Sequence, residues 1–241
     1  MITVCDMHSH VLPAMDDGSK DPAMSIQMLE AAAGQGVTKV LATPHYYPVE
    51  SVKAFLERRN KAACELQEAM ASSGKHLPQV YLAAEVAYRP GIGYEEDLKS
   101  LCIGDSEFML LELPFTTWGA EVLRDIRNMI CTKGITPVLA HLERYMHIRK
   151  NRKMLAELLQ LGVLVQMNGE AVLQRSSRRL ALKMLKNGMV HLLGSDCHNM
   201  TSRAPNLGSA VQQLQQIRGM ERTLDQISFI GMDILEQARC L

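Results

Sequence analysis

The sequence predicts an α/β protein, with a closed or nearly closed (β/α)7 TIM-like barrel as the expected fold and a doubly wound open sheet as the alternative. Short apolar runs and amphipathic helices alternate seven times along the chain, and most of the loops between them are short. The runs are almost continuously apolar, as expected for parallel strands with both faces covered. Right-handed crossovers leave few other topologies. Because no linker or low-complexity segment interrupts the 241 residues, we expect residues 1–241 to form a single domain with a helical C-terminal tail.

The expected strands are apolar runs that stop at a polar residue. They lie at residues 2–5, 37–42, 80–84, 108–111, 136–140, 163–167 and 190–194. The first helix begins at Asp21-Pro22, an N-cap followed by proline at the first helical position, and ends near Gly34. The other helices are predicted from apolar residues at helical spacing, with glycine after several of them. They lie at about residues 52–74, 94–101, 120–131, 152–161, 178–186, 206–217 and 224–239.

Composition and charge exclude several classes of protein. Hydrophobic residues make up 47% of the chain, enough for a large buried core. Lys+Arg and Asp+Glu number 26 each, so no overall field favours nucleic acid as a partner. No apolar run approaches the roughly 20 residues of a transmembrane helix, and no signal peptide is predicted. The six cysteines are scattered without a C-x-x-C pair, which favours a reducing cytoplasm.

The side chains that can carry chemistry follow the predicted strands. His8 and His10 project on the same side of the first strand, where two imidazoles can bind one metal ion. The carboxyl ends of parallel strands converge on one face, which is where ligands bind. Asp17, in the first loop, can reach the same face. The residues at the other strand ends are His45, Glu85, Glu112, His141, Asn168, Asp196 and His198.

Metal ligation is the economical explanation of this set. Carboxylates that converge at the mouth of a barrel would repel each other, whereas divalent cations neutralise them. Without the Asn168 amide, the set holds nine imidazole and carboxylate groups. Nine candidate ligands are too many for one ion, so two or three ions are expected, and nitrogen and oxygen ligands without thiolate suggest Mn, Fe or Zn. Such a site activates water and holds a phosphoryl group, whose oxygens guanidinium groups bind well. Arg144 and Arg203 are placed for this role, shortly after His141 and His198.

Together the motifs resemble the PHP (polymerase and histidinol phosphatase) superfamily. Asp6-x-His8-x-His10, His45, Ala140-His141-x-Glu143-Arg144-Tyr145 and Ser195-Asp196-x-His198-Asn199 occur in that family's order. Within it, the chain is most similar to the bacterial manganese-dependent protein-tyrosine phosphatases of capsular polysaccharide loci, the CpsB/CapC/YwqE group. The features that carry this closer likeness are Asp16-Asp17-Gly18, Glu85 ahead of Tyr88, and Gln166-x-Asn168. The resemblance spans residues 2–200.

This resemblance implies a distorted seven-unit barrel, a trinuclear centre with manganese favoured, and phosphotyrosine hydrolysis by a metal-bridged hydroxide. It implies that Arg144 and Arg203 bind the phosphate, with Asp196 also in the catalytic site. The implied partner is a tyrosine-phosphorylated bacterial kinase, recognised through its tyrosine-rich tail, that controls polysaccharide export. The residues at the family's ligand positions are His8, His10, Asp17, His45, Glu85, Glu112, His141, Asp196 and His198.

Two segments depart from the family pattern, and three other functions stay open. Tyr46-Tyr47 stands where some relatives carry basic residues, and Leu142-Glu143 where many have Pro-Glu. The main alternative is a small-molecule phosphoesterase of the histidinol-phosphatase type, and a second is a scaffold that binds phosphotyrosine without turnover. A third is a thiolate phosphatase, because Cys197 and Arg203 have Cys-x5-Arg spacing, although the residues between them lack phosphate-cradling glycines. The sequence also leaves open whether the chain forms a homo-oligomer.

Overall fold

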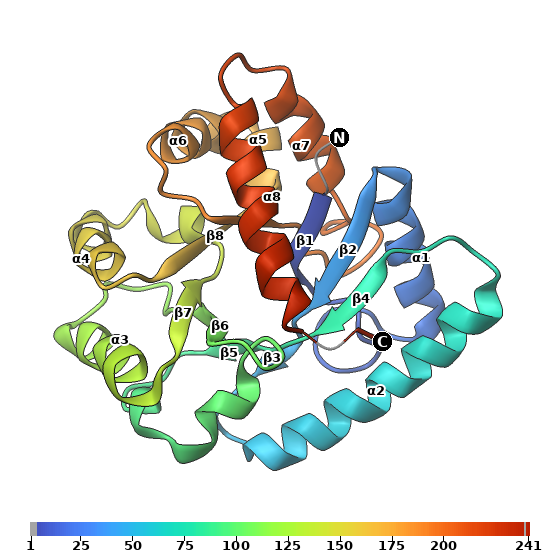
Figure 1. Cartoon of the computed structure of the whole chain (residues 1–241), viewed down its shortest axis with the longest axis horizontal. Coiled ribbons are helices and arrows are strands. Elements are labelled where there is room, and N and C mark those ends of the chain that lie inside the picture. Colours follow the sequence, from blue (N-terminus) through green and yellow to red (C-terminus); the bar gives the residue numbers. More distant parts are fainter. Residues whose placement is uncertain (1–3, 239) are drawn as a thin grey trace.

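A curled parallel sheet surrounded by helices forms the centre of the computed structural model, which describes residues 4–238 and 240–241 (Figure 1). The sheet consists of two ladders, in the orders β1-β2-β4 and β3-β5-β6-β7-β8-β9, and every strand pair within them is parallel. The α/β class and the parallel sheet are therefore as predicted. The strands are β1 Val4–Ser9, β2 Val37–Ala42, β3 His45–Tyr46, β4 Gln79–Leu82, β5 Glu85–Ala87, β6 Phe108–Glu112, β7 Thr136–Leu139, β8 Leu164–Asn168 and β9 Leu192–Gly194.

Two of the predicted strands are followed by a break and a second short strand that the sequence did not predict. After β2 the chain passes through Thr43-Pro44 and enters β3, and after β4 it passes through Ala83-Ala84 and enters β5. Proline has no N–H for a ladder, and the N–H of His45 donates to the Asp16 carboxylate at 2.8 Å. The broken strands bring His45 and Glu85 side by side as register partners. The two predicted strand-end residues thus begin short strands rather than end long ones.

Strand β1 contains much of the His-x-His motif instead of stopping before it. It runs from Val4 to Ser9, whereas the predicted strand covered residues 2–5, of which 2 and 3 lie outside the described residues. Its end lies beside the chain that leaves β9, through a parallel bridge between Ser9 and Cys197. The N–H of His10 donates to the Cys197 carbonyl at 2.9 Å. The first and last strands therefore meet beside the first motif, which contains His8 and His10, and the last motif, which contains Asp196 and His198.

The helices cover the outside of the sheet, and most begin or end within a few residues of the predicted positions. Asp21 caps the first helix by accepting the N–H of Met24 at 2.8 Å, with Pro22 at the first helical position, as predicted. The helical piece predicted at 94–101 is instead two 3-10 turns, Ile92–Tyr94 and Glu96–Leu101. The α-helices are α1 Pro22–Gly34, α2 Val52–Ser73, α3 Ala120–Lys133, α4 Arg149–Gln160, α5 Glu170–Leu173, α6 Arg175–Lys186, α7 Leu207–Gln215 and α8 Glu221–Glu236.

Alternate strand residues face two separate cores, as side chains on a pleated strand must. Leu41 and Leu110 pack on one side of the sheet with Ile234 and Leu235 of α8. Their neighbours, such as Val40, pack on the other side against the surrounding helices. Helix α8 lies close to β1 in Figure 1, and its Ile234 and Leu235 are buried in the core. No helix among the described residues is long and apolar enough to cross a bilayer.

Candidate metal centre

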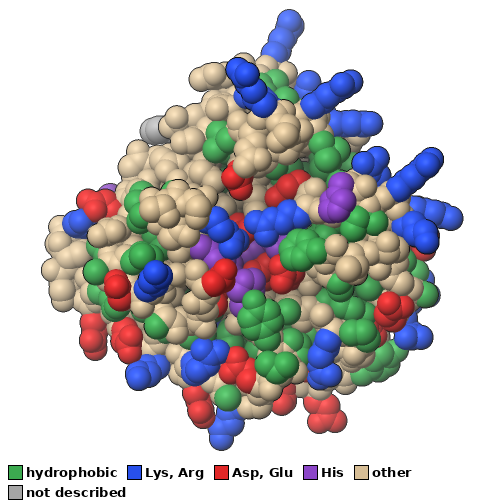
Figure 2. Space-filling view, turned by 180° about the vertical axis from the view of Figure 1, so that it is seen from behind, with side chains coloured by type: hydrophobic (Ala, Val, Ile, Leu, Met, Phe, Trp, Pro, Cys, Tyr) green, Lys and Arg blue, Asp and Glu red, His purple; other side chains and the backbone are tan. Residues whose placement is uncertain are grey.

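The nine predicted ligands come together in one hollow at the carboxyl end of the sheet. Figure 2 shows histidine and acidic side chains gathered in this hollow, with Lys and Arg side chains above it and hydrophobic side chains below and beside it. Asp17, in the loop after β1, has a 66% exposed side chain and lies at the rim, whereas His8 and His10 are buried. The other predicted ligands begin the short strands β3 and β5, end β6, or lie in the loops after β7 and β9, namely His45, Glu85, Glu112, His141, Asp196 and His198.

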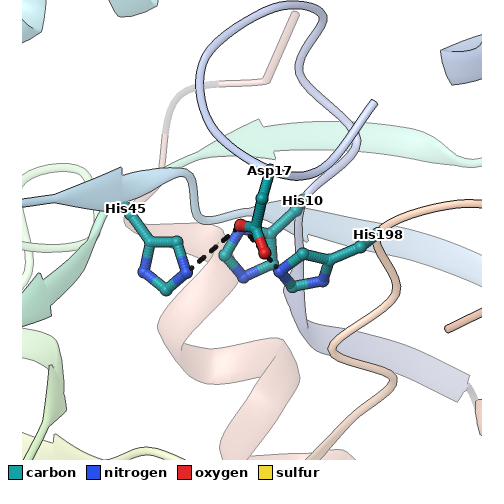
Figure 3. Close-up of side chains that lie close together, drawn as sticks. All are labelled: His10, Asp17, His45 and His198. Atoms are coloured by element: carbon teal, nitrogen blue, oxygen red, sulfur yellow. Dashed lines mark ion pairs between the residues drawn. The ribbon is translucent and has the colours of Figure 1, made fainter. Parts of the chain in front are cut away.

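Three overlapping groups have donor atoms within 4.8 Å of one another, close enough for each to hold a metal ion. One group contains a single carboxylate with three imidazoles, and Figure 3 shows Asp17 between His45 and His198 with His10 behind. The groups share members, as ligands of neighbouring ions do. Their members are His10, Asp17, His45 and His198; His8, His10 and Glu85; and His45, Glu85 and Glu112.

The hydrogen-bond partners of His8 and His10 fit metal binding by both residues. The Nδ1 atom of His8 lies 3.1 Å from Gln166 Oε1, and the Nδ1 atom of His10 lies 2.8 Å from Asp16 Oδ2, so each Nδ1–H donates to an oxygen. Each ring then presents the lone pair of Nε2 to the hollow, and the two Nε2 atoms lie only 3.2 Å apart. Two lone pairs at that distance repel unless a cation lies near both. A metal-bound histidine with its other nitrogen bonded to a carboxylate or amide is the usual arrangement.

Unpartnered buried nitrogens indicate the same donor chemistry. His198 Nδ1 lies 3.0 Å from the carbonyl oxygen of Asp196, which leaves its Nε2 buried without a hydrogen-bond partner. The Nδ1 atoms of His45 and His141 are also buried and unpartnered. His45 Nδ1 lies 3.1 Å from Glu85 Oε2 without the alignment of a hydrogen bond. Buried polar atoms are rarely left unsatisfied, so these atoms require an additional partner.

Glu85 is the central carboxylate of the hollow. Its side chain is 1% exposed and lies within 3.3 Å of His8, His10, His45 and His141. Burial alone would raise the pKa of the Glu85 carboxyl, but in the metal-free protein the positive charge of a protonated His8 and the hydrogen bonds from His10 and His141 hold it well below its usual range. A bound cation would supply that positive charge instead when His8 and His10 are neutral and turn their Nε2 lone pairs to the metal. Burial likewise opposes a charged His141, yet bonds to Glu112 and Glu85 raise its pKa to about 9. Glu85 is therefore ionised, and its buried negative charge requires positive charge close by.

Asp196 lies between the two predicted phosphate-binding arginines. Its Oδ2 accepts from Arg144 at 2.5 Å and from the Asn168 amide at 2.9 Å, and its Oδ1 accepts from Arg203 at 2.7 Å. Burial would raise the pKa of Asp196, but in the metal-free protein the charge of a protonated His8, a hydrogen bond from His10 and the charge of Arg144 hold it far below its usual value. The arginine side chains are about one third exposed. Both guanidinium groups thus reach the hollow from the solvent side.

Among the described residues, two of the three non-glycine residues with a positive φ are proposed ligands, one after β7 and one after β9, and the third is Ala14. His141 has φ of 33° and Asp196 has φ of 54°, both in the left-handed region that non-glycine residues rarely adopt. The Gln166 side chain accepts the N–H of His141 at 2.7 Å, and the N–H of Asp196 donates to the His8 carbonyl at 2.7 Å. Strain of this kind persists where surrounding contacts over-determine it, which is typical of functional sites.

Sequence reasoning did not assign roles to several residues that shape the hollow. Asp16 and Gln166 orient His10 and His8, although in the sequence only Asp17 was expected to be a ligand and Gln166 was only a family feature. Tyr47 and Phe115 line the cavity beside the arginines and were not predicted to do so. Spacing could have pointed to Asp16, which precedes Asp17 in the same loop. No spacing signal marks an aromatic residue in the loop after a strand.

Cys197 is unsuited to act as a nucleophile. The residue is 2% exposed, and burial together with the nearby Asp6 carboxylate raises the pKa of its thiol well above the usual range. A thiolate nucleophile needs the opposite, a lowered pKa and access to substrate. The Cys-x5-Arg spacing with Arg203 is therefore not a thiolate-phosphatase loop.

The comparisons with known proteins agree with this geometry. The chain is 29% identical over 231 residues to the tyrosine-protein phosphatase YwqE of Bacillus subtilis, covering 90% of this chain and 85% of that protein. It is 26% identical over 233 residues to the tyrosine-protein phosphatase CpsB of Streptococcus agalactiae, covering 90% and 92%.

Solved structures extend the likeness to three dimensions. One chain from crystal structures of YwqE from Bacillus subtilis and CpsB from Streptococcus pneumoniae, described as unique metal-dependent tyrosine phosphatases, superposes with a TM-score of 0.84. That match has 26% identity over 99% of this chain and 96% of the other. A phosphotriesterase homology protein from Escherichia coli, at 14% identity and a TM-score of 0.53 over 95% and 97%, shares the fold alone. Residues 4–234 match the family described as capsular polysaccharide synthesis, CpsB/CapC, and the chain belongs to that family.

Proposed function

We propose that the protein is a metal-dependent protein-tyrosine phosphatase. The observation that carries this proposal is one hollow in which imidazoles with free lone pairs, an ionised buried carboxylate and two guanidinium groups face the same space. Metal-assisted hydrolysis of a phosphate monoester needs these components together. The CpsB and YwqE relatives are named as tyrosine-protein phosphatases, which supports phosphotyrosine as the substrate.

The proposed cofactors are two or three divalent ions, with manganese favoured over iron or zinc. The overlapping donor groups support more than one ion, since they share His10, His45 and Glu85. Bound there, the ions would supply Lewis acidity and an activated water for attack on phosphorus. The proposed ligands are His8, His10, Asp17, His45, Glu85, Glu112, His141, Asp196 and His198.

Arg144 and Arg203 are the proposed phosphate-binding residues. Each guanidinium donates to Asp196, so an entering phosphate dianion competes with that carboxylate for the same N–H groups. The two arginines donate to different oxygens of Asp196, and both line the same cavity. Guanidinium groups fit phosphate oxygens and keep their charge at any relevant pH. We propose that Asp196 thereby positions both arginines and also contributes to the catalytic site.

The finer features of the fold and biology are proposals as well. A distorted seven-unit barrel is supported by the Ser9–Cys197 bridge, which links the two ladders at one end. We propose that residues 1–241 act as one phosphoesterase domain, and that α8 belongs to it, because Ile234 and Leu235 pack in its core. A cytoplasmic location is supported by six free cysteines. The proposed substrate is the tyrosine-rich tail of an autophosphorylating bacterial kinase, and a homo-oligomer remains a prediction.

A phosphatase assay with and without chelator tests the proposed function. The substrates are p-nitrophenyl phosphate, a phosphotyrosine peptide and histidinol phosphate. We expect turnover of the first two that disappears with chelator and returns with Mn²⁺, and slow turnover of histidinol phosphate. Faster turnover of histidinol phosphate would favour the small-molecule phosphoesterase, and tight binding of the peptide without turnover would favour the scaffold.

A further inference from the structure

We propose that Tyr47 and Phe115 form an aryl subsite that makes the enzyme select aryl phosphates over alkyl phosphates. The proposal rests on the proposed function and adds the residues that would distinguish phosphotyrosine from phosphoserine. Both residues line the same cavity of about 270 Å³ as Arg144 and Arg203. Neither residue belongs to the proposed metal ligands.

Tyr47 presents a ring to solvent beside one proposed ligand. It follows strand β3 and is 48% exposed. Its ring stacks on His45, with ring centroids 5.2 Å apart and planes 27° apart. The preceding residue, Tyr46, is buried and its hydroxyl donates to the Glu50 carbonyl at 3.1 Å. The chain is therefore anchored at Tyr46, which holds the ring of Tyr47 at the rim of the cavity.

Phe115 presents a second ring on the other side of strand β5. It lies in the loop after β6, is 50% exposed, and stacks on His141 at a centroid distance of 5.6 Å with planes 20° apart. It also stacks on Tyr145, which is fully buried, at 5.4 Å. The Tyr145 hydroxyl in turn accepts the N–H of Leu113 at 3.1 Å. Phe115 thus has one supported side and one side free for a ligand.

The cavity is chemically two-sided because of the order of the strands. Tyr47 and Phe115 come from the loops after β3 and β6, which flank β5 in the sheet, whereas Arg144 and Arg203 follow β7 and β9. Figure 2 shows the same division, with basic side chains above the hollow and hydrophobic ones below and beside it. A phosphate held by the arginines would therefore place its ester group toward the rings. An aryl ester can stack there, and an alkyl ester cannot.

Half-exposed aromatic rings at the mouth of a polar cavity are otherwise unfavourable, because they leave apolar surface in water. Each stacking contact with a substrate ring strengthens binding by about 3- to 10-fold, in addition to the effect of burying apolar area. Removal of either ring should therefore lower the preference for an aryl substrate on the order of 10-fold, and removal of both should lower it further.

The experiment compares Tyr47→Ala and Phe115→Ala with Tyr47→Phe, which keeps the ring, and with Phe229→Ala as the control. Phe229 is 73% exposed on α8 and does not line this cavity. The readout is the ratio of kcat/KM for a phosphotyrosine peptide to that for the phosphoserine peptide of the same sequence. We expect the ratio to fall about 10-fold in both alanine variants and to stay unchanged in Tyr47→Phe and Phe229→Ala. An unchanged ratio in both alanine variants would overturn the proposal.

Two further measurements distinguish an aryl subsite from rings that only shield the metal ligands. Elemental analysis should find the same metal content in the alanine variants as in the wild type. If metal content and both activities fell together, the rings would only be shielding the histidines, and the proposal would be wrong.

Calorimetry with phenylphosphonate and methylphosphonate needs no turnover. We expect the wild type to prefer phenylphosphonate and the alanine variants to lose that preference. A preference without any phosphatase activity would support the subsite and refute the proposed function, whereas no preference in the wild type would refute the subsite.

Discussion

Replacement of Asp16 tests whether the residues behind the histidines set the affinity for metal. The Oδ2 atom of Asp16 lies 2.8 Å from His10 Nδ1 and accepts the N–H of His45 at 2.8 Å, while Oδ1 accepts the N–H of Gly18 at 2.9 Å. Burial would raise the pKa of Asp16, but in the metal-free protein the hydrogen bond from His10 and the positive charge of the protonated imidazole bring that pKa down to about 2. The carboxylate is therefore charged at neutral pH. It fixes the tautomer of His10 and the position of His45 at the same time.

Asp16→Asn keeps the shape of the side chain but removes its charge and turns one acceptor into a donor. Loss of such a partner typically weakens metal binding about 10- to 100-fold, which corresponds to about 1.4–2.8 kcal/mol. We expect that loss in a titration of Mn²⁺ into the metal-free protein, together with p-nitrophenyl phosphate turnover that recovers in part at high Mn²⁺. Asp105→Asn, at an exposed carboxylate outside the hollow, is the matched control.

Denaturant unfolding of the metal-free variants separates this effect from damage to the fold. If Asp16→Asn binds Mn²⁺ within about twofold of Asp105→Asn, the carboxylate does not act through His10, and the reasoning from the tautomers is refuted.

Three other predictions concern the packing, the mechanism and the pH dependence. Gly194→Ala would place a Cβ 2.6 Å from the Cβ of His8, a proposed ligand. We therefore expect the free energy of unfolding to fall by about 1–3 kcal/mol and metal binding to weaken. Gly34→Ala, where an added Cβ meets no neighbouring atom within 4 Å, is the control in the same urea titration. Cys197→Ser should keep most phosphatase activity and His141→Ala should abolish it, and the reverse pattern in a p-nitrophenyl phosphate assay would overturn the metal mechanism. Burial lowers the pKa of His191 below its ordinary 6.5, so the unfolded chain takes up its proton first as the pH falls. The metal-free wild type should therefore lose stability below about pH 6.5 relative to His191→Gln, and parallel stability curves for the two proteins from pH 7.5 to 5.5 would contradict this.

The sequence predicted the regular elements well because their signals are local. Apolar runs, the Asp21-Pro22 start and the glycines after helices depend on neighbouring residues, and β2 begins and ends where it was expected. The breaks after β2 and β4 depend on where the chain must bend to enter the hollow. Pro44 gave a sign of the first break, whereas nothing in Ala83-Ala84 marks the second. The short helix α5 was likewise not predicted.

The gathering of the candidate ligands could be predicted because strand ends of a parallel sheet converge whatever the details of the loops. The orientation of each ring could not, since it depends on contacts between distant segments. Gln166, for example, meets His8 across 158 positions of sequence. The stacking of Phe115 on His141 and Tyr145 depends in the same way on the path of a loop.

The central claim is that bound metal carries out the hydrolysis, and elemental analysis combined with a reconstitution assay tests it most directly. The protein is purified without chelator, its metals are counted, and p-nitrophenyl phosphate turnover is measured before chelation, after chelation and after addition of Mn²⁺. We predict two or three equivalents of a divalent transition metal per chain and turnover that is lost and regained with them. Full turnover by the metal-free protein would contradict the account.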